Sequence, residues 1–177
     1  MAGSWAWGLN QYQFGPLSCT IVIMIRINRE TDYATAILGL MASDPRERYS
    51  AAWVAQQRGL PQTMVSKILK LLVRARLLES HRGAKGGYSL ARPAEEISIA
   101  QVVRAVEGPI ALTDCIEGGG EACQYSANCA MSSNWSRINE AFYRALEGVS
   151  IKDMNQPLSP EHPSLRGIDI RITSAVS

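Results

Sequence analysis

The 177-residue sequence lacks the features that mark several large classes of protein. No apolar run approaches the roughly eighteen residues of a membrane-spanning helix, so we expect no contact with a membrane. Residues 1–23 have no positively charged stretch and no A-x-A cleavage pattern, which argues against an export signal and favours a cytoplasmic protein. No nucleophile–base pair and no cofactor fingerprint is recognisable, so we expect neither an enzyme nor a small-molecule substrate.

Cysteine is scarce, but its distribution is uneven. Three of the four cysteines, Cys115, Cys123 and Cys129, fall within the segment DCIEGGGEACQYSANC. A glycine-rich segment cannot build a core, and clustered cysteines in a protein that is not exported favour metal binding or redox chemistry. The C-x7-C-x5-C spacing differs from the paired cysteines of structural zinc and suits a larger iron–sulfur cluster. Zinc and free redox thiols remain alternatives on spacing alone.

Positive charge is concentrated in one block. Residues 58–92 contain eight basic residues and one acid, although the whole chain carries a net charge of only +2. The rest of the chain is therefore net acidic. A basic block on an acidic chain is typical of a surface that binds a polyanion.

The same block has the pattern of a helix-turn-helix. A first helix is expected over 31–42, and Ser50 can N-cap a second helix that ends at Gly59. A third helix follows with Pro61 in its first turn. Its apolar positions recur at helical spacing: Val65, Ile68, Leu69 and Leu72. Two helices joined by a short glycine-containing turn indicate a helix-turn-helix.

The segment that follows predicts a winged helix-turn-helix. Short apolar runs around the glycines of LLESHRGAKGGYSLA indicate a β-hairpin. Ser98 and Gln101 form a capping box for a helix over about 99–107, which stops at Gly108. A longer helix, capped by Ser133 or Asn134, should run to about Gly148, and its narrow apolar stripe suits self-association.

The expected fold is thus mainly α with a small β-hairpin: a winged helix-turn-helix plus a long C-terminal dimerisation helix. We expect a disordered or non-native extension over 1–23 and a DNA-binding domain over 24–98. Residues 99–154 should hold the cysteine loop and the dimerisation helix, and residues 155–177, rich in proline, should form a disordered tail.

Double-stranded DNA is the expected partner of the basic block. Gln62, Thr63 and Ser66 lie near the start of the third helix, where base contacts usually fall. Lys67 and Lys70 are placed to contact phosphates. Arg82 and Lys85, at the tip of the hairpin, are candidates for the minor groove.

From Met24 to about Leu158 the chain resembles the winged-helix iron–sulfur regulators typified by IscR and NsrR. The matching stretches are TDYA (31–34), RGAKGGYSLARP, ISIAQVVRAVEG, and the cysteine trio followed by the Trp135 helix. Within that family the chain looks most like regulators of the SUF iron–sulfur assembly operon. The resemblance implies a homodimeric repressor of iron–sulfur assembly genes with a cluster in each subunit. A nitric oxide or redox sensor of the same fold is an alternative, and so is a cluster carrier or a zinc-stabilised winged helix.

The resemblance also implies the ligands of the cluster. Cys115, Cys123 and Cys129 correspond to the three thiolates. Ser132 stands where IscR-type proteins have a histidine, and Asp32 matches the aspartate that NsrR-type proteins supply from the other subunit. We therefore expect Asp32 of the partner subunit as the fourth ligand and a [4Fe–4S] rather than a [2Fe–2S] cluster.

Overall fold

The computed structural model describes residues 27–83, 86–113, 116, 129–156 and 162. The expected extension over 1–23 and most of the expected tail lie outside these residues. Helices dominate and one two-stranded antiparallel sheet accompanies them, which confirms the expected fold class. In chain order the elements are α1 (Arg29–Ala42), α2 (Ala51–Arg58), α3 (Gln62–Arg74), β1 (Leu78–His81), β2 (Gly87–Leu90), the 3-10 helix η1 (Ala94–Glu96), α4 (Ile99–Glu107), α5 (Ser132–Glu147) and α6 (Ile151–Met154).

The helix-turn-helix forms as its capping residues predict. The Ser50 side chain accepts a hydrogen bond from the backbone N–H of Trp53 at the start of α2. Gly59 ends α2 in the left-handed conformation, with φ 63°, which glycine adopts without steric cost. At α1 the helix starts two residues earlier than expected, because Asn28 accepts hydrogen bonds from Glu30 N and Thr31 N.

The wing is a short hairpin that is joined to the segment before α2. Leu78 pairs with Leu90 and His81 pairs with Gly87. Tyr49 forms an additional antiparallel bridge with Tyr88, which fixes the hairpin to the helix-turn-helix. Gly87 is required there, because a Cβ would lie 2.9 Å from the carbonyl oxygen of Tyr49.

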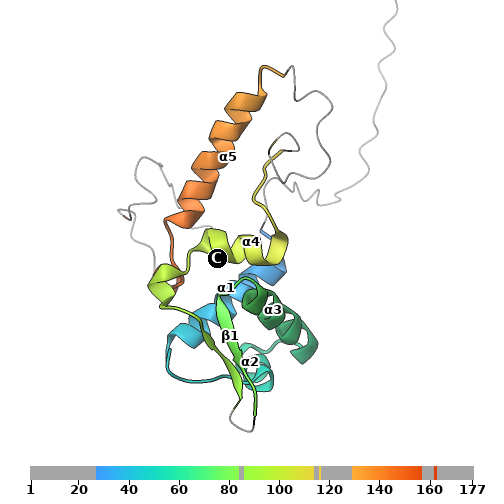
Figure 1. Cartoon of the computed structure of the whole chain (residues 1–177), viewed down its shortest axis with the longest axis vertical. Coiled ribbons are helices and arrows are strands. Elements are labelled where there is room, and N and C mark those ends of the chain that lie inside the picture. Colours follow the sequence, from blue (N-terminus) through green and yellow to red (C-terminus); the bar gives the residue numbers. More distant parts are fainter. Residues whose placement is uncertain (1–26, 84–85, 114–115, 117–128, 157–161, 163–177) are drawn as a thin grey trace, which may run out of the picture.

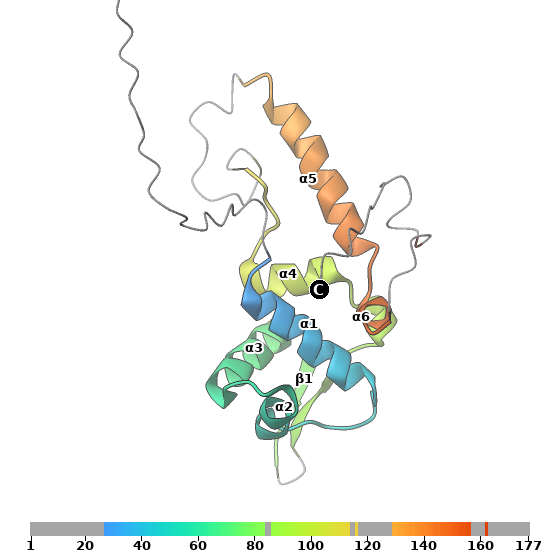
Figure 2. The same ribbon diagram turned by 180° about the vertical axis from the view of Figure 1, so that it is seen from behind.

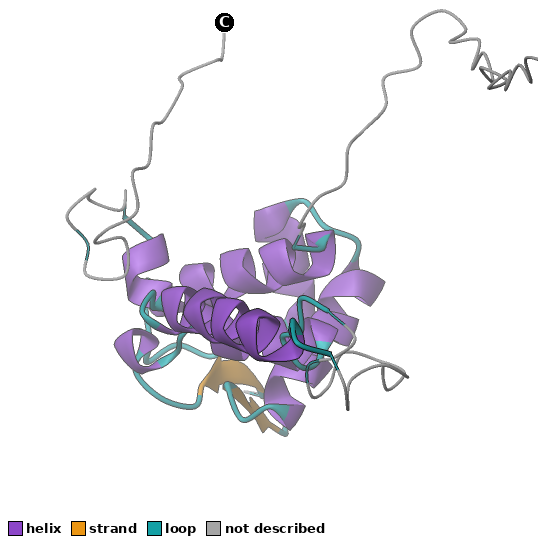
Figure 3. Ribbon diagram, turned by 90° about the horizontal axis from the view of Figure 1, so that it is seen from above, coloured by secondary structure: helices purple, strands orange, loops and turns teal. Residues whose placement is uncertain are grey.

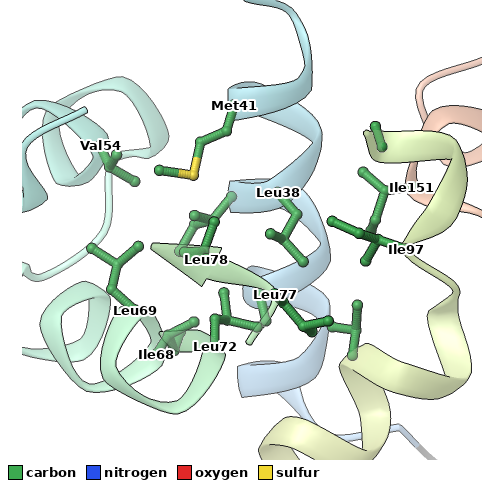
Figure 4. Packing of buried hydrophobic residues seen from close by; sticks show 14 of the residues in the cluster. Leu38, Met41, Val54, Ile68, Leu69, Leu72, Leu77, Leu78, Ile97 and Ile151 are labelled. Carbon is green, nitrogen blue, oxygen red and sulfur yellow. The ribbon is translucent and has the colours of Figure 1, made fainter. Parts of the chain in front are cut away.

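One hydrophobic core connects α1, the helix-turn-helix, the wing, α4 and α6. Leu38 of α1 lies between the leucines of α3 and β1 on one side and Ile97 and Ile151 on the other (Figure 4). The side chains of Leu38, Ile97 and Ile151 are fully buried. The core therefore extends across the domain boundary expected at residues 98 and 99, and the chain folds around α1 as one body (Figure 2).

The C-terminal helices differ in part from expectation. The capping box of Ser98 and Gln101 at α4 is confirmed. Ser133 and Asn134 do not cap α5: the helix starts at Ser132, and its N-cap residue, Met131, makes no side-chain cap. Helix α6 was not predicted. It has a capping box of its own, formed by Ser150 and Asp153, which spans most of this four-residue helix.

The chain stays packed beyond α6. Asn155 ends α6 and donates from Nδ2 to the carbonyl oxygen of Gly39 in α1, at 3.0 Å. Gly39 makes room for this contact, since a Cβ there would lie 2.5 Å from Asn155 Oδ1. The packed part of the chain thus includes the first residue assigned to the tail.

Helix α5 projects from the body at the end opposite to the wing (Figure 1). None of its residues is buried, and in the view from above it lies in front of the rest of the body and is seen obliquely along its axis (Figure 3). Within the described ranges, no helix is both long and apolar enough to cross a membrane.

Candidate functional site

The outward face of α3 collects the polar side chains that the sequence assigned to DNA. These side chains are Gln62, Thr63, Ser66, Lys67 and Lys70. Together with Leu71 and Arg74 they line an open groove of about 640 Å³. The opposite face is fully buried through Val65, Ile68, Leu69 and Leu72. This strict division turns every predicted α3 contact toward solvent, with Gln62 and Thr63 at the helix start and Arg74 at its end. We call this surface the α3 face.

Lys67 already has a partner on the α3 face. Its Nζ lies 2.6 Å and 2.9 Å from the two carboxylate oxygens of Glu30, in the first turn of α1. The two side chains are 60% and 30% exposed, so water competes with the pair. Lys70 forms no ion pair with any residue that the structure describes. The two lysines therefore differ in their readiness to contact a phosphate.

The wing carries a further exposed cation, Arg82, whereas Lys85 lies outside the described residues. The loop between α1 and α2 adds two arginines that sequence reasoning missed. Arg46 and Arg48, with Glu47 and Gly86, line a groove of about 470 Å³ beside the wing. Sequence reasoning missed them because they precede the basic block. They come near the wing because the neighbouring residue Tyr49 forms a bridge with Tyr88 of the hairpin, a contact that only the structure reveals.

Both ends of the cysteine loop are tied to α5. Before the loop, Asn139 of α5 accepts from the N–H of Leu112 and donates to the carbonyl oxygen of Ile110, each at 3.0 Å. After the loop, the Cys129 carbonyl oxygen accepts from Ser132 N at 3.2 Å and Ser132 Oγ at 2.9 Å. Ser132 thus serves a structural purpose at the position where a histidine was considered. Asn139 carried no signal in the sequence, because an asparagine within a helix has no local pattern.

Of the three loop cysteines, Cys129 is described, and it is a half-buried free thiol. Cys115 and Cys123 lie outside the described residues. Asp32 is exposed in the first turn of α1. In the part of the single chain that is described, no three metal-ligating side chains meet. The position of Asp32 is therefore compatible with contact to a second chain.

A part-buried hydrogen bond fixes the turn that carries Asp32. Thr31 is 1% exposed, and its Oγ1 donates to Glu107 at the end of α4, at 2.5 Å. Glu107 also accepts from the backbone N–H of Asn28 at 3.1 Å. The start of α1 is thus held by the end of α4, the helix that leads into the cysteine loop.

Comparisons with known proteins agree with this layout. The Rrf2 family profile, described as an iron-dependent transcriptional regulator, matches residues 27–157. An HTH-type transcriptional regulator of Mycobacterium tuberculosis is 32% identical over 148 residues, which cover 83% of this chain and 91% of that protein. The HTH-type transcriptional regulator NsrR of Oceanobacillus iheyensis is 28% identical over 133 residues, covering 73% of this chain and 89% of NsrR. The structure of CymR, the global cysteine regulator of B. subtilis, is similar with a TM-score of 0.57 and 25% identity, covering 75% of this chain and 97% of CymR.

Proposed function

The chain belongs to the Rrf2 family of DNA-binding transcriptional regulators, and we propose that it senses iron–sulfur cluster status and represses genes of cluster assembly. Its relatives are regulators rather than enzymes, and so is this chain. The observation that carries the sensing proposal is the tethering of the cysteine loop to α5 at both ends, at Asn139 and at Cys129. A ligand held by that loop acts directly on the projecting helix.

We place DNA along the α3 face and the wing. Gln62, Thr63 and Ser66 contact base edges, because they stand exposed or half-exposed near the start of the helix. Lys70 and Lys67 contact phosphates, as Arg82 does from the wing. Lys85, which lies outside the described residues, stays a predicted contact on the basis of the sequence. The groove lined by Arg46, Glu47, Arg48 and Gly86 adds two more cations next to the wing.

A second copy of the chain covers α5. Helix α5 is amphipathic, but its apolar side is not covered, because none of its residues is buried. Three large apolar side chains on or next to it are exposed: Met131 (61%), Trp135 (41%) and Ile138 (49%). Burying a large apolar side chain stabilises by about 1.5–3 kcal/mol, so leaving these exposed on a helix this long is costly. An antiparallel or crossed pair of α5 helices removes them from water and brings two α3 faces onto one side of the dimer. Two readers suit a two-fold symmetric operator.

The residues of the chain fit an iron–sulfur cluster in their donor chemistry. Thiolates are the standard ligands of such clusters, and the loop supplies Cys115, Cys123 and Cys129. Cys129 is a free thiol, and the exposed Asp32 forms no ion pair with other residues in the described ranges. A carboxylate from the partner subunit completes a four-ligand set of the [4Fe–4S] type. The bound cluster supplies an oxidisable and labile centre.

The chain's own contacts carry the response. Cys129 is hydrogen-bonded to Ser132 at the start of α5, so the ligand loop and the dimerisation helix move together. Asp32 is fixed to α4 through Thr31 and Glu107. When Asp32 of the partner subunit is joined to the loop, α1 of one protomer is linked to α5 of the other. That link biases the spacing of the two α3 faces, and its loss shifts the population between DNA-binding arrangements.

Anaerobic purification followed by absorption spectroscopy and iron, sulfide and zinc analysis tests the proposal. We expect a coloured protein that contains iron and acid-labile sulfide, and a Cys129→Ser variant that has lost them. Cys19→Ser is the matched control, because Cys19 lies outside the loop in sequence, and it should retain both. A colourless wild-type protein with zinc would overturn the sensing proposal. Asp32→Ala tests the fourth ligand, and unchanged cluster content and stability in air would remove Asp32 from the set.

DNA binding is tested separately. A Lys67→Ala/Lys70→Ala variant should bind every sequence more weakly and show a shallower salt dependence, because phosphate contacts carry no sequence information. The slope of log K against log salt should fall by about 0.9 for each lost phosphate contact. An unchanged slope would mean that DNA lies on another face.

A further inference from the structure

An open cavity lies where the end of α3, the start of the segment after β2, and α4 meet. It has a volume of about 300 Å³ and is lined by Ala75, Leu77, Arg92, Gln101, Arg104 and Ala105. The cavity is separate from the groove of the α3 face, which has a different set of lining residues. It is also separate from Cys129 and Asp32, neither of which lines it. We call it the Arg92–Arg104 cavity.

The charge of this cavity is uncompensated. Among the residues that the structure describes, its lining contains two arginines and no acidic residue. Arg104 is exposed, and it forms no ion pair with any residue in the described ranges. The other lining residues are Gln101, Leu77 and two alanines. Two arginines that line one cavity without a neighbouring carboxylate attract an anion.

Arg92 shows an unmet hydrogen-bonding need. Its Nη2 donates to Gln101 Oε1 at 3.0 Å, but its Nε is shielded from solvent and has no acceptor within the described part of the chain. Gln101 Oε1 also accepts from Ser98 N at 3.2 Å. Both contacts use the oxygen of the Gln101 amide, so toward the cavity this side chain can offer the donor Nε2. A buried donor without a partner is costly, and an unseen bound ion is one of its ordinary explanations.

We propose that the Arg92–Arg104 cavity binds a small oxyanion, a phosphate or a carboxylate, between the two guanidinium groups. Guanidinium groups bind both anions through charge-assisted and often bidentate hydrogen bonds. The volume lies at the lower end of the range for small-molecule sites, about 300–1,000 Å³, which limits the ligand to a small anion.

The bound anion joins three parts of the fold. Arg92 follows β2 at the base of the wing, Arg104 belongs to α4, and Ala75 caps the end of α3. An anion held by both arginines therefore links the segment that follows the wing to α4, the helix that leads into the cysteine loop, beside the end of α3. This inference is independent of the cluster and of DNA, because it requires only the cavity and its two cations.

Isothermal titration calorimetry of the full-length protein, in the absence of DNA, tests the site. Sodium phosphate and sodium malonate are titrated separately at constant ionic strength, with sodium chloride as the blank. We expect saturable binding of one anion per chain by phosphate or malonate, and none by chloride. Binding of only one of the two identifies the anion as phosphate-like or carboxylate-like. Failure of both to saturate the wild-type protein would overturn the proposal.

Variants locate the binding. Arg104→Gln should weaken it by about tenfold or more, since a hydrogen bond to a charged group contributes roughly 1.5–3 kcal/mol. Arg92→Lys keeps the charge but removes Nε, and it should weaken binding as well. Arg29→Gln, an equal loss of charge on the exposed first residue of α1, should leave it unchanged. Equal affinity in wild type, Arg104→Gln and Arg92→Lys would show that the anion binds elsewhere.

A DNA titration excludes the other source of phosphate. If the cavity contacted the DNA backbone, Arg104→Gln would flatten the salt dependence of DNA binding by about 0.9 per contact. We expect no change in this slope. A flattened slope together with no binding of free anions would overturn the proposal and assign the cavity to the DNA interface. Circular dichroism of each variant confirms that it is folded, and the exposed position of Arg104 makes a folding defect in that variant unexpected.

Discussion

The ion pair between Glu30 and Lys67 should restrain DNA binding. Lys67 faces the groove of α3, but Glu30 holds its ammonium group with both carboxylate oxygens, at 2.6 Å and 2.9 Å. A phosphate must displace this carboxylate before it can contact Lys67. A Glu30→Gln substitution removes the negative charge and leaves a side chain of nearly the same shape. It should therefore raise the affinity for DNA of any sequence.

The size of the effect follows from the exposure of the pair. Ion pairs between exposed side chains contribute about 0.2–1 kcal/mol, and the Lys67 side chain is 60% exposed. Release of this restraint corresponds to a decrease in Kd of up to about fivefold for each Lys67 that reaches a phosphate. Each new phosphate contact should also steepen the slope of log K against log salt by about 0.9. Fluorescence anisotropy with labelled duplexes, measured between 50 and 200 mM salt, gives both quantities.

The comparison needs a control for the general loss of negative charge. Glu96→Gln serves this purpose, because Glu96 is exposed on η1 and forms no ion pair with other described residues. Glu30→Gln should exceed this control in both affinity and slope. In a Lys67→Ala background the excess should disappear, because the cycle isolates the coupling between the two side chains. If Glu30→Gln matches Glu96→Gln, or if its effect persists without Lys67, the restraint does not exist.

Three further outcomes follow from other contacts. Trp135→Asp on α5 should convert the dimer to monomers in analytical ultracentrifugation, whereas a dimer of unchanged stability would exclude this face as the interface. Asn139→Ala removes the partner of the Leu112 N–H, so the amide of Leu112 should exchange its hydrogen faster, as measured by exchange mass spectrometry, and unaltered exchange would show that Asn139 does not hold the loop. Hydrogen bonds from Ser150 lower the pKa of Asp153, with a smaller contribution from His162. The charged carboxylate therefore stabilises the fold at every pH above the ordinary pKa of an aspartate. This stabilisation is lost as the pH falls through the lowered pKa. Asp153→Asn should therefore be less stable than wild type in urea unfolding at pH 7 and approach it as the pH falls below the ordinary pKa of an aspartate, and a difference that is independent of pH would contradict this assignment.

The local elements were predictable where short-range chemistry decides them. Ser50, Gly59 and the pair of Ser98 and Gln101 mark helix ends through their own hydrogen bonds or backbone conformation, and each lies where expected. The start of α5 was misplaced because Ser133 and Asn134 are both good caps in isolation. There the carbonyl oxygen of Cys129 holds Ser132 in the first turn instead, and that contact depends on how the loop is folded.

The composition of the α3 face was predictable as well, since a helix of strict amphipathic pattern can expose only its polar side. The ion pairing of its charged side chains could not be predicted from the sequence. Glu30 and Lys67 are far apart in sequence, and their contact depends on the packing of α1 against α3. The same reason explains why Asn139 and the link between Thr31 and Glu107 were missed. Contacts of this kind belong to the tertiary structure, and no period or motif records them.

The shared core of α1, α4 and α6 has a consequence for how this molecule can move. The part that reads DNA and the part that carries the cysteine loop are not connected by a flexible linker, because Leu38, Ile97 and Ile151 are packed against one another without exposure to solvent. Bending one part against the other would open this core. In the α5-paired dimer that we propose, each protomer would therefore respond as a rigid lever that pivots at the contact between the two copies of α5. The crossing angle of that helix pair would then set the distance between the two α3 faces.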